Sequence, residues 1–440
     1  YRRSKCRIMA TYYWVGGAGT WDNTNTAGMW KTTSGGATNA PNAPLATDVA
    51  TFDVNSGTGA VSIAATATCL TCNFGGSGIT ATLTANHTVT FSTLNISAGT
   101  FNCSTFNHTV TNLTHTGGTF TCNGGTISAS TFNSTGAVAR TINLNASTLA
   151  LVGAITFSGT NLTFNAGTSQ INCSAASAIT WAGNGVTFYN VSFTSTVAVN
   201  PKTFTGNNTY NNLTFATRGS AGVSIITFNA DQVINGTLTI PAAPTLGSFR
   251  YAIQSDTLGT TRTITAATVS LNDVDFRDIT GAGAATWSGA RLGNCGGNSG
   301  ITFPTAKTVY WNLAGAQNYS ATGWATTQTG TPADVNFPLP QDTAIFTDTA
   351  PVAGTTVTIN AAYNIGALDF STRTNTLTFA TGTIAPSIYG NITLSSAITV
   401  SGTGIITFLG RNTTQTITSA TKTFRSEERR VGKECLRLCR

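Results

Sequence analysis

Apolar and polar residues alternate over short stretches of this chain, and the alternation returns at a nearly constant interval. Seven positions keep a step of 19 residues within their own series: Leu94, Leu113 and Phe132; Phe101 and Phe120; Cys103 and Cys122. A repeat this short cannot form an independent domain, and it is typical of one coil of a solenoid, whose apolar side chains are buried only against neighbouring coils. We therefore predict an all-β, right-handed parallel β-helix (β-solenoid) in which these seven residues form an inward core ladder.

A second repeat has a spacing that differs from 19 residues. Asn86–Thr90 returns as Asn107–Thr111, 21 residues later. This spacing predicts that His87 lies one coil from His108, as a ladder on the surface, because two imidazoles without a third ligand make a poor metal site.

A second pattern places Asn ahead of an apolar-polar-Phe stretch, at Asn161–Phe164, Asn190–Phe193 and Asn212–Phe215. Asn tolerates a bend before a strand, and stacked Asn side chains can bond to one another. We expect these segments to stack.

A Trp-containing module near the start of the chain recurs about 295 residues later, although the second copy has Asn312–Gly315 in place of the first copy's glycine-rich run. Residues 13–22 read Tyr-Trp-Val-Gly-Gly-Ala-Gly-Thr-Trp-Asp, and a D-x-x-x-F motif follows at Asp48–Phe52 and recurs at Asp342–Phe346. An open solenoid end exposes strand edges and core, so an aromatic lid is expected there. The predicted cap residues are Trp14, Trp21, Trp30, Trp311 and Trp324.

These features predict two tandem units. The expected segments are a non-native leader at 1–8, an aromatic entry module at 9–55, a β-solenoid at 56–304, a second entry module at 305–350, a second, truncated β-solenoid at 351–424 and a tail at 425–440. Residues 425–435 resemble a translated sequencing adapter; a genuine basic tail is the alternative.

Charge limits the function classes. The whole chain has a formal charge of +7, but residues 9–424 hold equal numbers of basic and acidic side chains. The body therefore lacks the positive field that nucleic-acid binding needs, and we expect no nucleic-acid partner. No apolar run approaches the length of a membrane span, and no signal peptide is visible from Met9.

The densest charge cluster is Asp273, Asp275, Arg277 and Asp278. On a strand, residues 273, 275 and 277 would face outward while Val274 and Phe276 face the core. Three carboxylates on one face could bind Ca²⁺. The alternative, which we favour, is a solvated face of local ion pairs with neither metal nor catalytic role.

The opening Tyr13–Asp22 resembles that of uncharacterised phage-type virion proteins. The wider W-G-G…W…P…D-x-x-x-F pattern is similar to modules that precede β-solenoids in bacterial surface passenger proteins, although Met29-Trp30 stands where Asn-Trp is commoner. The resemblance implies surface or tail structure, with no catalytic residues to transfer, and a homotrimer as in tail proteins of this type.

We therefore expect a non-enzymatic structural or adhesive protein of a virion or an extracellular surface, presenting a polar face to a surface glycan or a partner protein. One alternative is a pectin-lyase-like polysaccharide lyase or hydrolase that uses residues 273–278 and Ca²⁺; another is a secreted bacterial surface adhesin. No other cofactor is expected. Trp181, Trp287 and Tyr389 are candidates for stacking on sugars.

Overall fold

The computed structural model describes residues 9–83, 87–197, 200–243, 247–349, 354–411 and 414–422. The predicted leader and tail lie outside these residues. Nearly half of the chain, 47%, is in strands, and stacked parallel strands form a β-solenoid of about 16 turns, which confirms the predicted fold class. The chain divides into two compact units, one of residues 1–305 with 361–364 and one of residues 306–360 with 365–440.

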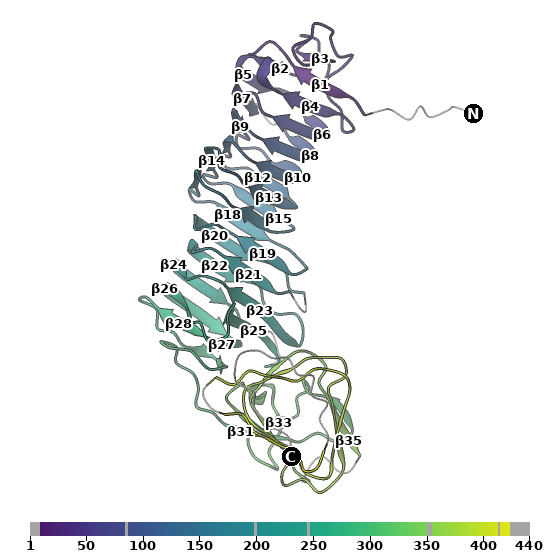
Figure 1. Cartoon of the computed structure of the whole chain (residues 1–440), viewed down its shortest axis with the longest axis vertical. Coiled ribbons are helices and arrows are strands. Elements are labelled where there is room, and N and C mark those ends of the chain that lie inside the picture. The colour runs from purple at the N-terminus through teal and green to yellow at the C-terminus, as the bar shows by residue number, and fades with distance from the viewer. Residues whose placement is uncertain are drawn as a thin grey trace, which may run out of the picture. The chain divides into compact units, whose positions relative to one another are not determined.

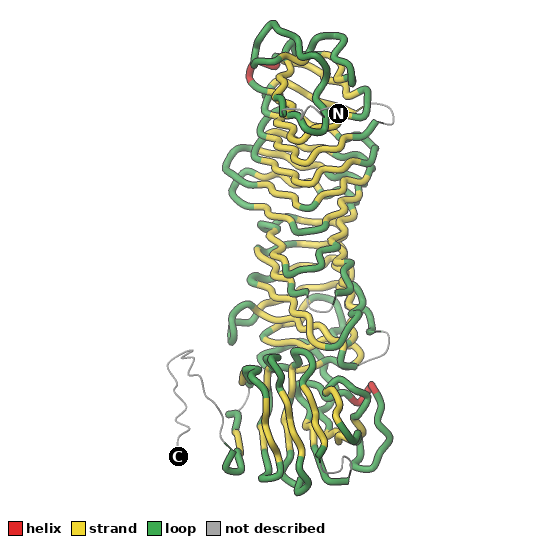
Figure 2. Tube along the Cα trace, turned by 90° about the vertical axis from the view of Figure 1, so that its right-hand side faces the viewer, coloured by secondary structure: helices red, strands yellow, loops and turns green. Residues whose placement is uncertain are grey.

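In the first unit, the strands of successive coils lie one on another (Figures 1 and 2). One parallel stack consists of β12 (Thr126–Ala129), β15 (Thr148–Leu151), β18 (Gln170–Cys173), β20 (Thr187–Phe193), β22 (Thr209–Phe215), β24 (Gln232–Ile240), β26 (Arg262–Asn272), β28 (Ile279–Ala282) and β29 (Gly289–Ala290).

A second parallel stack belongs to the same sheet. It consists of β1 (Thr11–Trp14), β4 (Val49–Phe52), β13 (Thr131–Ser134), β16 (Ile155–Phe157), β19 (Ile179–Ala182), β21 (Lys202–Thr205), β23 (Gly222–Phe228), β25 (Phe249–Ser255), β27 (Val274–Arg277) and β30 (Gly293–Asn294). Three longer strands join the two stacks: β6 (Ala67–Phe74), β8 (Val89–Ile96) and β10 (His108–His115). β10 shows how they do so, because it pairs with both β12 and β13.

A separate parallel sheet forms another face of the first unit. Its strands are β2 (Gly19–Trp21), β5 (Thr58–Ile63), β7 (Gly78–Leu83), β9 (Thr100–Asn102), β11 (Gly118–Thr121), β14 (Arg140–Asn143) and β17 (Leu162–Asn165). Along most strands of the unit, buried and more exposed residues alternate, as a strand with one face in a core requires.

The predicted core ladder is confirmed. Leu94 pairs with Leu113 and Leu113 with Phe132, and all three are fully buried. Phe101 and Phe120 are also in register and buried. Cys103 and Cys122 are buried free thiols.

The pairing corrects the interpretation of the 21-residue repeat. β8 and β10 pair with an offset of 19 residues, which places His108 beside Val89 and Ile127 rather than beside His87. His108 is buried, so the predicted surface ladder of histidines is wrong. The apolar positions set the register because a one-residue slip would turn them all outward.

The Asn pattern is confirmed in part. Asn190 stacks on Asn212, whose side-chain nitrogen donates to the side-chain oxygen of Asn190 at 2.9 Å. Asn161–Phe164 does not join them, because β17 belongs to the separate sheet. The same short motif therefore occupies two faces of the solenoid.

The aromatic module closes the start of the first unit. Trp14 and Trp21 both contact Trp30, with ring centroids 5.3 and 4.9 Å away, and all three are buried. β3 (Trp30–Lys31) pairs antiparallel with β1, and a 3-10 turn, η1 (Val54–Ser56), follows β4. Gly17 has a positive φ of 74°, and a Cβ there would lie 2.4 Å from the Thr58 carbonyl oxygen, so the turn requires glycine.

The Asp of the repeated D-x-x-x-F motif has a structural role in both copies. The buried carboxylate of Asp48 accepts from the backbone N–H groups of Ala10 at 3.3 Å and Leu45 at 3.0 Å. Asp342 does the same for Lys307 at 3.0 Å and Leu339 at 2.9 Å. Each Asp therefore ties the entering chain to the turn ahead of the next strand.

The second unit repeats the cap topology by itself. Its strands are β31 (Thr308–Trp311), β32 (Ala316–Asn318), β33 (Trp324–Ala325), β34 (Thr343–Ile345), β35 (Thr355–Thr358), β36 (Asn364–Ile365), β37 (Ala367–Asp369), β38 (Leu377–Ala380), β39 (Ser387–Ile388), β40 (Ile392–Thr393), β41 (Ile398–Ser401), β42 (Thr407–Phe408) and β43 (Ile417–Thr418), with a 3-10 turn η2 (Asp334–Asn336). The first residue of β36, Asn364, groups with the first unit. Trp311 pairs with Trp324, both are buried, and Tyr319 contacts Trp324 as Trp21 contacts Trp30.

Replacing Leu113 by Ala should destabilise the first unit by about 3 kcal/mol, because the cavity would lie between two packed neighbours in the column. Thr109→Ala, on the exposed side of the same strand, should change stability by less than about 0.5 kcal/mol. Urea unfolding, monitored by tryptophan fluorescence, measures the free energy of unfolding of each variant. Similar losses for the two variants would contradict the inward column.

Candidate functional site

The predicted charge cluster lies at the last coils of the first unit. Asp273 and Asp278 flank β27, and both adopt a positive φ, 54° and 53°, so each terminates the extended strand rather than continuing it. Val274 and Phe276 are fully buried, as expected for inward positions.

The expectation that Asp273, Asp275 and Arg277 would form an outward, solvated face is wrong for the two acids. Asp273 is 2% exposed and Asp275 is fully buried, while the side chain of Arg277 is 11% exposed. The alternation rule fails here because the outer side of β27 is covered. The guanidinium of Arg250, on the neighbouring strand β25, donates to Asp275 Oδ1. The side-chain amide of Asn364 donates to Asp275 Oδ2 at 2.9 Å, and Asn364 belongs to the segment 361–364 that groups with this unit.

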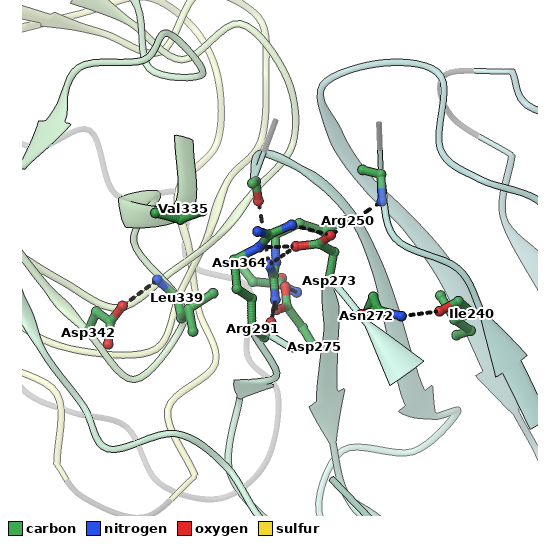
Figure 3. A network of polar contacts seen from close by, with 12 residues as sticks. Ile240, Arg250, Asn272, Asp273, Asp275, Arg291, Val335, Leu339, Asp342 and Asn364 are labelled. Atoms are coloured by element: carbon green, nitrogen blue, oxygen red, sulfur yellow. Dashed lines mark hydrogen bonds and ion pairs between the residues drawn. The ribbon is translucent and has the colours of Figure 1, made fainter. Parts of the chain in front are cut away.

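Two arginines and two aspartates form one network (Figure 3). Arg250 donates to Asp275 Oδ1 from Nε at 2.9 Å and from Nη2 at 2.5 Å, and its Nη1 lies 3.5 Å from Asp273 Oδ1. Arg291 binds Asp273 in a bidentate manner, with both N–O distances 2.6 Å. Arg250 Nη2 also donates to the Arg291 carbonyl at 2.7 Å. The four charges cancel.

The remaining two residues of the cluster are not part of this network. Asp278 Oδ2 accepts from the Gly259 N–H at 3.0 Å, and its distance to Arg277 Nε is 3.8 Å. Asp278 therefore anchors a turn, and the three carboxylates do not converge on one point.

This arrangement suits a structural role better than a metal site. Burial raises the pKa of Asp275, and the Arg250 guanidinium opposes that rise. Both oxygens of Asp273 are held by a guanidinium, so a Ca²⁺ ion would have to displace Arg291. Among the residues that the structure describes, no three His, Cys, Asp or Glu side chains gather as metal ligands would.

Two histidines are buried, His108, which the sequence pattern placed on the surface, and His115. Val89 N–H donates to His108 Nδ1 at 3.3 Å, and His108 Nε2 lies 2.8 Å from the Cys103 carbonyl. His115 Nδ1 lies 3.3 Å from Ser134 Oγ and its Nε2 3.2 Å from the Gly118 carbonyl. Burial lowers the pKa of both, that of His115 to about 4, with a further lowering by Arg140.

The candidates for sugar stacking are not available as exposed platforms. Trp181 is fully buried and Trp287 is 3% exposed, so both belong to the core, and Tyr389 is half-buried. No aromatic side chain in the described ranges is exposed. Any ligand of the outer faces must therefore be recognised by other groups.

The outer face of the first unit carries columns of small polar side chains that pair from coil to coil. One such column contains Thr90, Thr109, Ser128, Ala150, Asn172 and Ser192. Another, on the separate sheet, contains Thr80, Thr100, Thr119, Thr141 and Thr163. Neighbouring members are about 4.8 Å apart because that is the distance between paired strands.

A groove of about 270 Å³ runs along the first column. Its lining includes Ser128, Ala150 and Asn172, together with a parallel row at Ser130, Val152 and Ser174. The residues come from β10, β12, β15 and β18 and the turns after them, so only coil stacking assembles the groove. Sequence inspection missed it because its lining residues lie in different coils and form an otherwise ordinary row of small side chains.

No protein-family model, curated protein or solved structure matches this chain. The resemblance of Tyr13–Asp22 to virion proteins stays a prediction. In the described part of the chain there is also no helix with the length and apolar character of a membrane span. Function must be argued from the groove, the columns and the buried network.

Replacing Asp273 by Asn should destabilise the first unit by roughly 3 kcal/mol, because it removes one of the two carboxylates that neutralise Arg250 and Arg291. Asn tolerates positive φ, so the backbone is preserved and the loss reports charge. Asp256→Asn breaks the more exposed pair with Arg262 and should cost less than about 1 kcal/mol. Urea unfolding at pH 7 measures the free energy of unfolding of the two variants. Equal losses for Asp273→Asn and Asp256→Asn would contradict a structural role for the buried network.

Acid should weaken the first unit through His115. Its pKa is about 4 in the folded chain and 6.5 when unperturbed, so the unfolded chain binds the proton first. Stability should therefore fall as pH drops below about 6.5 and stop falling below about 4, by up to about 3 kcal/mol. Urea midpoints between pH 7 and 4 measure this. His115→Gln should make the loss of stability smaller, leaving the part due to His108, and His87→Gln should not change it. Identical profiles for all three proteins would refute the assignment.

Proposed function

We propose that this chain is a non-enzymatic structural protein of a virion or tail-associated assembly, and that the outer face of its first solenoid binds a surface glycan. The observation that carries this proposal is the groove along the Thr109–Asn172 part of the column, where hydroxyl and amide groups lie beside the apolar side chains of Ala150 and Val152.

The chemistry of the columns suits a linear polar polymer. Hydroxyl and amide groups donate and accept hydrogen bonds, as sugar hydroxyls do. They repeat at the distance between coils, so an extended chain could make the same contact several times. Coils packed through a buried core present these groups with little conformational freedom, which reduces the entropy lost on binding.

The buried charge network supports a non-enzymatic role over a polysaccharide lyase. A lyase of the kind considered from the sequence would need solvent-accessible carboxylates and an arginine near the substrate. Asp273 and Asp275 are instead buried and held by guanidinium groups. The 273–278 cluster lies on β27 and its flanks, whereas the groove lies on β10 to β18.

The neutral body and the opening Tyr13–Asp22 support the assignment to a virion or tail. A protein without a net positive field in its body can lie near nucleic acid in a particle without binding it. The resemblance of the opening also underlies the proposal of a homotrimer, which light scattering on the purified chain would test.

Replacing Ala150 by Phe should fill the groove and reduce glycan binding at least tenfold, because the new ring would occupy the space between Ser128 and Asn172. Thr141→Phe adds the same ring to the separate sheet and should bind as wild type does. Arrays of purified bacterial surface polysaccharides identify a ligand, and titration of that polysaccharide measures the change.

Three results would contradict the proposal. One is that wild-type protein binds none of the polysaccharides on the array. Another is equal binding by the Ala150→Phe and wild-type proteins, which would exclude the groove. Release of unsaturated or reducing ends from a bound polysaccharide would show an enzyme instead.

A further inference from the structure

Two buried cations lie at one corner of the first unit, near the turns that precede β21 and β23. Lys202 is 2% exposed and Arg218 is 4% exposed. Neither forms an ion pair, and no carboxylate of the described residues lies within ion-pair distance of either. A buried charge must be paired or fully hydrogen-bonded, so the partners of these two cations decide how they are accommodated.

Lys202 points into the core. It pairs with Ile179 on one side and Ile226 on the other, both in an inward column. Its Nζ donates to the Asn200 carbonyl at 3.0 Å and lies 5.6 Å from the centre of the Phe193 ring. The pKa of Lys202 is lowered to about 8, chiefly by burial; Cys173 opposes this lowering and the Arg218 guanidinium adds to it.

Arg218 has incomplete hydrogen bonding. Its Nη1 donates to the Val197 carbonyl at 3.0 Å, while Nη2 reaches the Ser220 and Gly222 carbonyls only at 3.5 Å. The guanidinium lies 5.6 Å from the centre of the Tyr251 ring. Its buried Nε has no partner among the described residues.

Arg140 shows that this solenoid can satisfy a buried guanidinium with its own atoms. Its Nε donates to Ser134 Oγ at 2.9 Å, its Nη1 to the Gly136 and Thr160 carbonyls at 2.7 Å, and its Nη2 to the Ser158 carbonyl. Arg218 therefore differs from Arg140 in retaining a buried Nε without a hydrogen-bond partner among the described residues. The Nε of Arg277 also makes no hydrogen bond, but it lies 3.8 Å from a carboxylate oxygen of Asp278, whereas Arg218 has no such neighbour in the described part of the chain.

Further free donors lie at the same corner. The buried Oγ atoms of Ser220 and Ser248 have no hydrogen-bond partner among the described residues. Arg218 Nη2 reaches the Ser220 carbonyl, and the Gly222 N–H donates to the Ser248 carbonyl at 2.9 Å, so these residues adjoin one another. Three donors without a partner, Arg218 Nε and the two serine hydroxyls, favour an acceptor at this corner, and the two positive charges favour a negative one.

We propose that this corner binds a small inorganic anion of halide size, held by Lys202, Arg218 Nε and the hydroxyls of Ser220 and Ser248. The low exposure of these side chains favours a compact ion over a larger polyatomic one. Bound there, the anion would neutralise the two cations and connect the turns of neighbouring coils. This site is independent of the glycan-binding proposal.

The test compares urea unfolding of the whole chain in sodium chloride and in sodium gluconate at equal ionic strength. Gluconate is too large for the site. At a chloride concentration ten times its Kd, the unfolding constant of the wild-type protein should be about tenfold lower than in gluconate. Lys202→Met and Arg218→Met should lose this difference. Arg262→Leu, which removes a more exposed guanidinium, should keep it.

Crystals grown in sodium bromide supply a second measurement that does not depend on the variants folding. An anomalous peak within hydrogen-bond distance of Lys202 Nζ and Arg218 Nε is expected. Equal unfolding of wild-type protein in the two salts would overturn the proposal, as would a chloride response that persists in Lys202→Met. Bromide crystals without a peak at this corner would also overturn it.

Discussion

The stacking of each coil on its neighbours is the interaction on which the rest of this structure depends. Leu94, Leu113 and Phe132 have no interior of their own; each is buried because the coils above and below supply one. Parallel pairing at about 4.8 Å and burial of alternate side chains must be satisfied together, so the register is tightly constrained. Aromatic modules close the start of each unit, where stacking cannot continue.

The same constraint decides what happens to polar groups that the coils enclose. Asp48 and Asp342 accept backbone N–H groups, and Arg140 donates to carbonyls of two coils. Arg250 and Asp275 neutralise each other behind the outer face of β27. Each enclosed group is acceptable because neighbouring coils or turns provide its partners. Lys202 and Arg218 lack a counter-charge, which is why their corner points to a bound anion.

Function follows from what stacking leaves outside. The outward positions need only be soluble and compatible with strands, and Thr, Ser and Asn meet both conditions. Once the coils are in register, these side chains form columns, and a groove lined by Ser128, Ala150 and Asn172 lies along one of them. The surface that we propose for recognition therefore consists of positions that look interchangeable when each coil is considered separately. The buried histidines add a dependence on pH that is unrelated to this surface.

The sequence alone determined the all-β solenoid, the inward ladder and the tryptophan caps, because strand alternation, a 19-residue step and clustered aromatics are local signals. It did not determine which repeat aligns with which: the two N-H-T-V-T segments differ by two residues from the register that the apolar column imposes. Nor did it determine that Asp273 and Asp275 are buried, or that a groove forms beside Ala150. Those outcomes depend on which coil lies next and on what covers an outer face, and only the tertiary structure specifies either.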